Sequence, residues 1–251
     1  MTGTDTELVH IGLPLAVIIV VLAVCAAAVN FVSGSGMSRG TLIATVRAAA
    51  QLAALAAILA VVIQTLWASA AFVAVMGTTA AAISAGRVSG RRATVRATVR
   101  CLLPVAAPSI IVVLGLTLTG TVPAMGLAII PITGILIGGA MNTTSLAGKR
   151  AHDELRTRAG EVDAALALGF IKRDARLEIC RSASATALIP GLDQTRSVGL
   201  VTIPGAFVGM ILGGASTTAA AVMQLFVLVC LLCVSAIAAA TTVELVARND
   251  L

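Results

Sequence analysis

The sequence predicts an all-α, polytopic membrane protein, and features of its composition carry that prediction. Of its 251 residues, 59% are hydrophobic and only 11% are charged, whereas a soluble domain carries about 25% charged residues. The mean hydropathy is +1.05. Aromatic residues make up only 2%, so the apolar content is mostly small and aliphatic, which suits close helix packing in lipid. These features exclude a soluble enzyme, a disordered chain and a disulfide scaffold.

The long runs without charge give the number of membrane crossings. A helix needs about 20 apolar residues to span a hydrocarbon core of about 30 Å. The first run holds one crossing and each of three later runs is long enough for two, which predicts about seven transmembrane helices. The expected crossings are residues 13–31, two within 48–86 that turn near Trp67, two within 101–148 that turn near Gly120, and two within 197–243 that turn near residues 214–218.

The distribution of positive charge predicts the orientation. All 17 Lys and Arg residues fall in alternate connectors, around residues 39–47, 87–100, 149–196 and 248. Lys and Arg are retained on the cytoplasmic side during insertion. We therefore expect the amino terminus outside, the carboxy terminus in the cytoplasm, and a multi-pass location in the cytoplasmic (inner) membrane. The basic charge then belongs to the membrane topology, and we expect no nucleic-acid partner.

Residues 149–185 form the one cytoplasmic segment long enough to contact a partner, within a single transmembrane domain expected over residues 1–251. Residues 160–169 are predicted to form a short helix, because Glu161 favours the positive end of a helix dipole and Gly169 can supply a left-handed stop. Its predicted apolar face consists of Val162, Ala165, Leu166 and Gly169. Such a face fits the groove of a partner protein or the surface of the bilayer, and the pattern favours the two equally.

No motif for catalysis stands out in the chain. There is no G-x-x-x-x-G-K-[ST] phosphate loop, so the chain has no site of that kind for ATP. Cys230 and Cys233 form a C-x-x-C pair without further polar ligands nearby, which favours buried thiols over a metal site. We predict a protein that is not an enzyme and holds neither a metal nor a cofactor of its own.

Polar and helix-breaking residues within the apolar runs are the candidates for a substrate path. A polar group in the membrane costs a few kcal/mol, and broken helices often line such paths. Structural roles are also open: Arg47 can extend to the headgroups, Asp193 and Arg196 can pair, and lone amides can join helices. The candidates are Arg47, Gln51, Pro131, Gly138, Asn142, Asp193, Arg196, Pro204, Gly205 and Gln224.

Glycine spacing predicts where helices cross closely. Gly205, Gly209 and Gly213 form two overlapping G-x-x-x-G steps, and Gly134 with Gly138 forms another. Such steps give a flat helix face that a neighbouring helix can approach. Pro190 is expected to precede the sixth helix, which Asp193, Gln194 and Arg196 would then open.

Several motifs resemble those of FetB-type (YbbM-like) ABC transporter permeases. Residues 129–142, IIPITGILIGGAMN, are similar to the family's V-I-P-I-x-G-M-x-x-G-N-x-M segment. Residues 187–205, ALIPGLDQTRSVGLVTIPG, are similar to its A-L-I-P-x-x-[ND]-x-x-x-x-V-G-L-V-x-L-P-G block. In shorter matches, Arg47 and Gln51 fit an R-x-x-x-Q, and residues 161–169 fit E-x-x-x-x-L-x-L-G.

This resemblance implies a permease subunit, expected to be a homodimer in the lipid bilayer, that works with a separate ATPase. ATP and Mg would be bound by that partner. Members of the family are linked to iron export and metal tolerance, and similar plant proteins to aluminium tolerance, so the expected cargo is iron or another metal or small solute. Coupling to the ATPase is assigned by the resemblance to Glu161, Val162, Ala165, Leu166, Leu168 and Gly169.

The chain departs from the family pattern at three places. Gly139 stands where the family has Asn, Ala206 and Phe207 replace a Met pair, and Met223 replaces an aromatic residue before Gln224. One amide and two thioethers that could contact a metal are therefore absent.

Two other functions remain open on the sequence. One is a membrane scaffold whose cytoplasmic segment binds a soluble partner without transport. The other is a secondary carrier driven by an ion gradient, which should contain buried acidic residues in mid-membrane. Only Asp193 and Glu244 are candidates for that role, and both lie near predicted helix ends.

Overall fold

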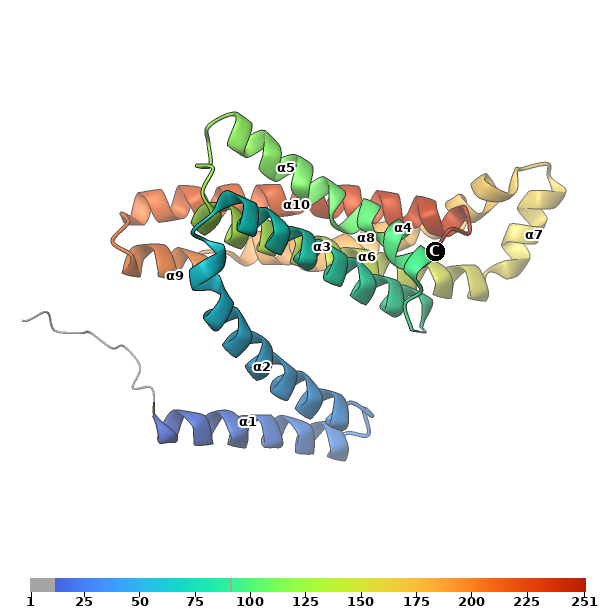
Figure 1. Cartoon of the computed structure of the whole chain (residues 1–251). Helices are drawn as coiled ribbons and strands as arrows, with labels where there is room; N and C mark the ends of the chain where they lie inside the picture. Colours follow the sequence, from blue (N-terminus) through green and yellow to red (C-terminus); the bar gives the residue numbers. More distant parts are fainter. Residues whose placement is uncertain (1–11, 91) are drawn as a thin grey trace, which may run out of the picture. The chain divides into compact units, whose positions relative to one another are not determined.

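The computed structural model describes residues 12–90 and 92–251, and these residues are predominantly helical (Figure 1). This confirms the all-α prediction. The helices are α1 (Leu13–Val32), α2 (Ser38–Val62), α3 (Leu66–Ser89), α4 (Val95–Val105), α5 (Ala107–Leu118), α6 (Gly126–Thr157), α7 (Ala159–Ala167), α8 (Lys172–Ser197), α9 (Gly205–Leu212) and α10 (Thr217–Ala247).

Over the described ranges, six helices are long and apolar enough to cross a membrane. They are α1, α2, α3, the successive pair α4 and α5, α6 and α10. The turns at residues 63–65, 119–125 and 213–216 fall close to the turns expected from the charge-free runs. The chain is therefore a multi-pass membrane protein, in agreement with the prediction, although the described residues hold six such helices where about seven crossings were expected.

The expected crossing after Pro190 has a different form. Helix α8 continues through Pro190 to Ser197, so Asp193 and Arg196 lie in its last turns and do not open the next helix. A membrane helix tolerates proline because neighbouring groups can satisfy the carbonyl that it frees. The helix stops instead before Gly199, which adopts the left-handed φ of 80°. An irregular segment, residues 198–204, then leads to α9, which has only eight residues.

The chain consists of two compact units, and the boundary between them in the sequence falls between Val61 and Val62. In the first unit, α1 and α2 are joined by a turn that side chains hold. The Asn30 Nδ2 atom donates to Thr41 Oγ1 at 3.0 Å, and Ser35 Oγ donates to the Asn30 carbonyl at 3.0 Å. The single transmembrane domain over the whole chain stays a prediction.

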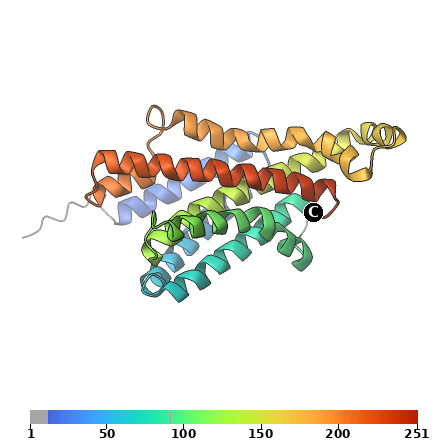
Figure 2. The ribbon, with the colours of Figure 1, turned by 90° about the horizontal axis from the view of Figure 1, so that it is seen from above.

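In the second unit, α6 is the central helix and packs against α3, α8 and α10 (Figure 2). Glycines on α6 allow this close approach. A Cβ atom at Gly148 would lie 2.5 Å from Val88 Cγ2 of α3, one at Gly139 would overlap Leu231 of α10, and one at Gly126 would overlap the first turns of α3. Lipid does not drive helices together as water does, so this packing supplies much of the cohesion.

Of the glycines in the G-x-x-x-G steps that the sequence singled out, only some lie close to a neighbouring helix. At Gly134 an added Cβ would lie 3.1 Å from Met76 Cε, but at Gly138, Gly205 and Gly209 it would meet no atom of the described chain within 4 Å. Within the described part of the second unit, the face of α9 that carries Gly205 and Gly209 is thus open. The prediction that this face crosses another helix of the same chain is wrong for the second unit.

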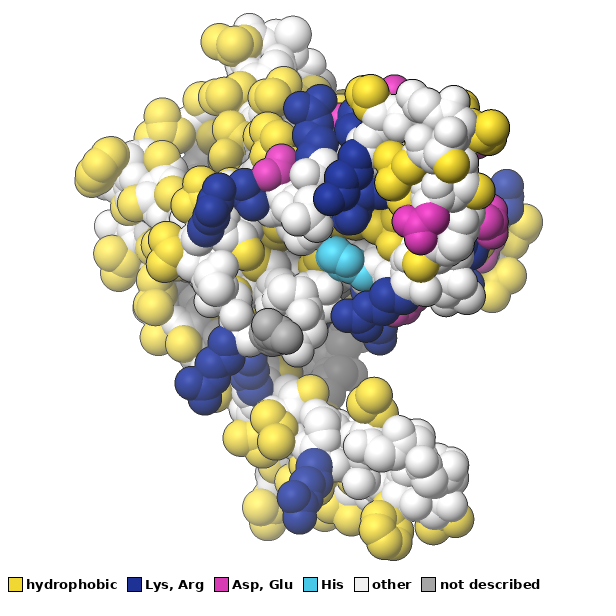
Figure 3. Space-filling model, turned by 90° about the vertical axis from the view of Figure 1, so that its right-hand side faces the viewer, with side chains coloured by type: hydrophobic (Ala, Val, Ile, Leu, Met, Phe, Trp, Pro, Cys, Tyr) yellow, Lys and Arg dark blue, Asp and Glu magenta, His cyan; other side chains and the backbone are white. Residues whose placement is uncertain are grey.

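The two ends of the second unit differ in charge. The turns at residues 63–65, 119–125 and 213–216 contain no acidic or basic residue. The opposite end carries the connector between α3 and α4, all of α7, and the end of α10. Figure 3 shows Lys, Arg, Asp and Glu side chains gathered at that end.

Candidate functional site

Helix α7 projects from the charged end of the second unit (Figure 1). Arg158 donates from Nε to Glu161 Oε1 at 2.7 Å and from Nη2 to Oε2 at 2.5 Å. These bonds hold the first turn and keep the pKa of the Glu161 carboxyl below its ordinary value. After the helix, Gly169 has a φ of 92°, and its N–H donates to the Leu166 carbonyl at 3.0 Å. The predicted short helix and its left-handed glycine are therefore confirmed.

The exposed apolar surface of this region lies at the carboxyl end of α7. Val162 and Ala165 of the predicted face are half-buried, and α7 packs against α8. The surface consists of Leu166, Leu168, Phe170 and Ile171, which are 38%, 80%, 54% and 63% exposed. We call these four residues the α7 tip. Phe170 and Ile171 were not among the sequence candidates, although an apolar pair directly after a stop glycine was a signal for them.

The start of α8, just beyond the α7 tip, is fixed to the end of α10. Arg173 donates from Nε to Glu244 Oε1 at 2.8 Å and from Nη2 to Oε2 at 2.6 Å. Together with Asp174, Glu244 raises the pKa of the Arg173 guanidinium above its ordinary value. Arg176 Nη2 also donates to the Val246 carbonyl at 2.8 Å. Helix α7 is thus connected through the start of α8 to the end of α10.

At its other end α8 leads into the irregular segment, residues 198–204. The Ser197 carbonyl accepts from the amide of Val201 at 2.9 Å, and the Thr202 carbonyl accepts from the amide of Gly199 at 2.9 Å. Pro204 is the N-cap of α9 and Gly205 its first residue. The candidates Asp193 and Arg196 at the end of α8 and Pro204 and Gly205 at the start of α9 therefore lie on the two sides of one break.

The ion pair expected at the end of α8 is present. Arg196 Nη1 lies 3.6 Å from Asp193 Oδ1, and the two side chains are 75% and 62% exposed. Arg196 is about 22 Å along α8 from Arg181, at 1.5 Å per residue. The pair therefore lies well away from the charged end of the unit.

Gln224 lies beside the same break. It occupies α10 about two turns after the start of that helix, and its side chain is only 8% exposed. It lines a cavity of about 290 Å³ together with Gly199, Ile203 and Pro204 from the irregular segment and Phe207 from α9. Its Oε1 atom accepts no hydrogen bond from the described residues.

The other sequence candidates lie elsewhere. Arg47 and Gln51 are exposed on α2, in the first unit. Asn142 Oδ1 accepts from Arg87 Nη1 of α3 at 3.4 Å, so this amide joins two helices. Pro131 and Gly138 both lie within α6, which is helical throughout. The helix is therefore not unwound at Pro131. The chain does break before Pro204, in the irregular segment between α8 and α9.

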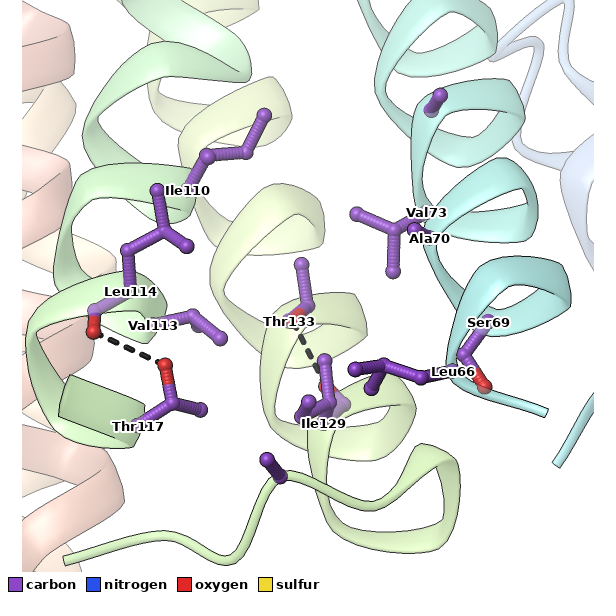
Figure 4. A pocket seen from close by; sticks show the side chains of 12 residues that line it. Leu66, Ser69, Ala70, Val73, Ile110, Val113, Leu114, Thr117, Ile129 and Thr133 are labelled. Atoms are coloured by element: carbon purple, nitrogen blue, oxygen red, sulfur yellow. Dashed lines mark hydrogen bonds between the residues drawn. The ribbon is translucent and has the colours of Figure 1, made fainter. Parts of the chain in front are cut away.

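A second cavity, of about 380 Å³, opens between α3, α5 and α6. Figure 4 shows Leu66 and Val73 facing Ile110 and Val113 across it. Its hydroxyl groups are used locally: Thr133 Oγ1 donates to the Ile129 carbonyl at 2.7 Å. The cavity is therefore apolar in character.

Residues that could hold a metal are not gathered anywhere in the described part of the chain. No group of three His, Cys, Asp or Glu side chains is close enough there to bind a metal ion.

A family model matches the amino-acid sequence over nearly the whole chain. The model is that of the uncharacterised protein family UPF0014, and it matches residues 13–250. The chain belongs to the UPF0014 family. No solved structure matches it.

Three relatives show how similar this chain is to individual proteins. The UPF0014 membrane protein YjkA of Bacillus subtilis is 28% identical over 222 residues, which is 87% of this chain and 86% of YjkA. ALUMINUM SENSITIVE 3 of Arabidopsis thaliana is 37% identical over 126 residues, covering 50% of this chain and 46% of that protein. The probable iron export permease FetB of Escherichia coli is 30% identical over 112 residues, 45% of this chain and 43% of FetB. The chain thus spans less than half the length of the last two relatives.

Proposed function

We propose that this chain is the transmembrane permease subunit of an ABC transporter, driven by a separate ATPase that binds ATP and Mg²⁺. The α7 tip is the observation that carries the proposal. It is an exposed apolar surface on a short projecting helix at the charged end, which fits insertion into a groove of a partner protein. The similarity to a protein named as a probable iron export permease supports the same activity.

The structure offers a mechanical route from the α7 tip to the break in the membrane. A partner that moves α7 also moves α8, because only residues 168–171 separate the two helices. The bidentate pair of Arg173 with Glu244 carries the movement into α10. At the far end of α8, the same movement displaces Asp193, Arg196 and the segment before Pro204. Closure of the ATPase would thus open or close the path beside this segment.

The proposal places the charged end of the second unit in the cytoplasm. Lys and Arg are retained there during insertion, and an ATPase is available only on that side. The carboxy terminus is then cytoplasmic, the amino terminus is outside, and the location is the inner membrane. The resemblance of the motifs to a permease family favours this assignment independently of charge.

We further propose that two copies of the chain form the permease. Asp193 and Arg196 are exposed on α8, and a charged side chain that faces the hydrocarbon core of a membrane is costly. Next to them, Gly205 and Gly209 leave the face of α9 open. A second copy that covers this face would remove the pair from lipid and bring two breaks together around one path.

The proposed cargo is iron, with another metal or small solute as the alternative. The printed name of the FetB relative supports iron. The name of the plant relative ALUMINUM SENSITIVE 3 supports a link to metals more broadly.

Co-purification of the chain with its ATPase tests the proposal through Leu166. A charge introduced at a buried apolar contact costs several kcal/mol, and truncating an anchor typically costs over about 1 kcal/mol. Leu166→Asp should therefore leave the chain inserted and folded but release the ATPase. Gly169→Val should act in the same direction more weakly, because a β-branched residue resists the left-handed conformation.

A matched control is available at the same end of the molecule. Val95, at the start of α4, is 82% exposed, so Val95→Asp adds the same charge away from the α7 tip. The ATPase should remain bound to this variant. An unchanged yield of complex with Leu166→Asp would move the docking site elsewhere, and the absence of any ATPase partner for the unmodified chain would support a scaffold or a secondary carrier.

A further inference from the structure

A basic cavity lies where the start of α8 meets the end of α10, at the charged end of the second unit. Its volume is about 390 Å³, and Lys172, Arg173 and Arg248 line it together with Ala247 and Asn249. Figure 1 shows these two helix ends beside each other. The proposed transport activity assigns no role to Lys172, Arg248 or Asn249.

The charges around this cavity do not cancel. Arg173 is paired with both Asp174 and Glu244, and the Nε atom of Arg248 donates to Glu244 at 2.6 Å. Three basic side chains thus accompany two acidic ones, so one positive charge remains in excess. Lys172 is exposed, and the Arg248 side chain is 57% exposed. A molecule from outside the chain can therefore reach both charged groups.

The backbone adds to the positive potential. Helix α8 begins at Lys172, and its N-cap residue, Ile171, has no polar side chain with which to cap the first turn. The N-terminus of a helix carries a partial positive charge and N–H groups that favour phosphate. Asp174 in the first turn offsets part of this charge. The cavity thus offers an ammonium, a guanidinium and the end of a helix to one anion.

We propose that this cavity binds a negatively charged phosphate group through Lys172 and Arg248. Guanidinium and ammonium groups both form strong hydrogen bonds to phosphate oxygens. An anionic lipid headgroup and a free phosphate compound share this chemistry.

The length of α10 favours the lipid headgroup. Its 31 residues extend over about 46 Å at 1.5 Å per residue, and a bilayer with its headgroups is about 40–45 Å thick. A helix of this length that crosses the bilayer therefore ends at the level of the headgroups. Basic cavities between membrane helices are suited to anionic headgroups at that level.

A phosphate in this cavity would join two helices that the proposed mechanism moves together. Lys172 is the first residue of α8, and Arg248 directly follows α10. The bound phosphate would bridge the same two helix ends as the pair of Arg173 with Glu244. An anionic lipid would thus strengthen the connection between α8 and α10. This site goes beyond the proposed transport activity, and binding to it requires no ATPase.

Native mass spectrometry of the full-length chain tests the site. The detergent-solubilised chain is titrated with phosphatidylglycerol, or with phosphatidylcholine of the same acyl chains, in which choline cancels the charge of the phosphate. We expect the first phosphatidylglycerol to bind more tightly than phosphatidylcholine. One basic side chain contributes about fivefold to the affinity for an anionic lipid. Arg248→Gln and Lys172→Gln should each weaken the binding of phosphatidylglycerol by about that factor.

Arg150→Gln is the matched control. Arg150 is 53% exposed and pairs with Glu154 at i,i+4, as Arg248 does with Glu244, but it lies outside the residues that line the cavity. This variant should bind phosphatidylglycerol as the unmodified chain does. An equal loss in Arg150→Gln would indicate attraction to the whole basic surface and would overturn the proposal.

Two other results would also count against the site. Unchanged binding of phosphatidylglycerol in either folded variant, Arg248→Gln or Lys172→Gln, would overturn the proposal, and if one of them does not fold the other decides alone. Equal binding of the two lipids by the unmodified chain would overturn it as well, and would leave the cavity to an acidic segment of a partner protein.

Glycerol 3-phosphate distinguishes the two sources of the phosphate. Sodium chloride at the same ionic strength serves as its control. Displacement of phosphatidylglycerol by glycerol 3-phosphate, but not by the salt, assigns the site to a free phosphate compound. Binding of phosphatidylglycerol that persists in both solutions assigns it to a lipid headgroup. Both results support a phosphate site, whereas equal displacement by the salt would reduce it to general charge attraction and overturn it.

Discussion

Gly148 provides a direct test of how the second unit is held together. A Cβ atom at this position would lie 2.5 Å from Val88 Cγ2, 2.8 Å from Cγ1 and 3.2 Å from Cβ. Rotation of the Val88 side chain cannot relieve all three contacts, because its own Cβ is among them and β-branched side chains are stiff in helices. Val88 is also 6% exposed, so it has little room to move. Gly148→Ala must therefore separate α6 from α3 or strain one of them.

The matched control lies on the same helix. Gly138→Ala also replaces glycine with a better helix former, but its Cβ would meet no atom of the described chain within 4 Å. The difference between the two variants thus isolates the clash, which we expect to cost about 1–3 kcal/mol. That corresponds to a difference of about 2–12 °C in melting temperature. Size-exclusion chromatography of detergent-solubilised protein after heating measures it, and equal melting temperatures would refute the close α3–α6 packing.

Three other features give predictions of their own. A reporter fused after Leu251 should be cytoplasmic and one inserted at Thr217 external; the reverse result would invert the proposed orientation. Arg173→Lys should speed amide exchange at the start of α8, since lysine cannot reproduce the bidentate bond to Glu244; unchanged exchange there would contradict this. Gly209→Leu should leave the melting temperature of the isolated chain within about 2 °C, since its Cβ faces open space, but should reduce cross-linking between two copies; unfolding of the chain would refute that placement.

Much of the architecture is predictable from charge-free runs and helix-stop signals. The run around residues 13–31 became α1, because lipid leaves the backbone no other partner than its own helix. Helix α7 was also predictable, because Gly169 can adopt a left-handed φ that other residues resist.

The helix partners were harder to predict, because glycine spacing does not show what a glycine faces. Gly139 and Gly148 form close contacts on α6, whereas the regularly spaced Gly205 and Gly209 form none within the described chain. Pro190 gave a false boundary, since α8 continues through it. The unpaired oxygen of Gln224 became visible only when the irregular segment was placed against α10, because it depends on residues far apart in the sequence.

ATP-driven transport in proteoliposomes tests the central claim most directly. The purified chain is reconstituted with its ATPase, and the movement of Fe²⁺ across the bilayer is followed with and without ATP and Mg²⁺. We predict that Fe²⁺ moves only when both subunits, ATP and Mg²⁺ are present, and that Leu166→Asp abolishes the movement while Val95→Asp does not. Transport by the chain alone along an ion gradient, or ATP hydrolysis that proceeds without moving Fe²⁺, another metal or a small solute, would contradict this account.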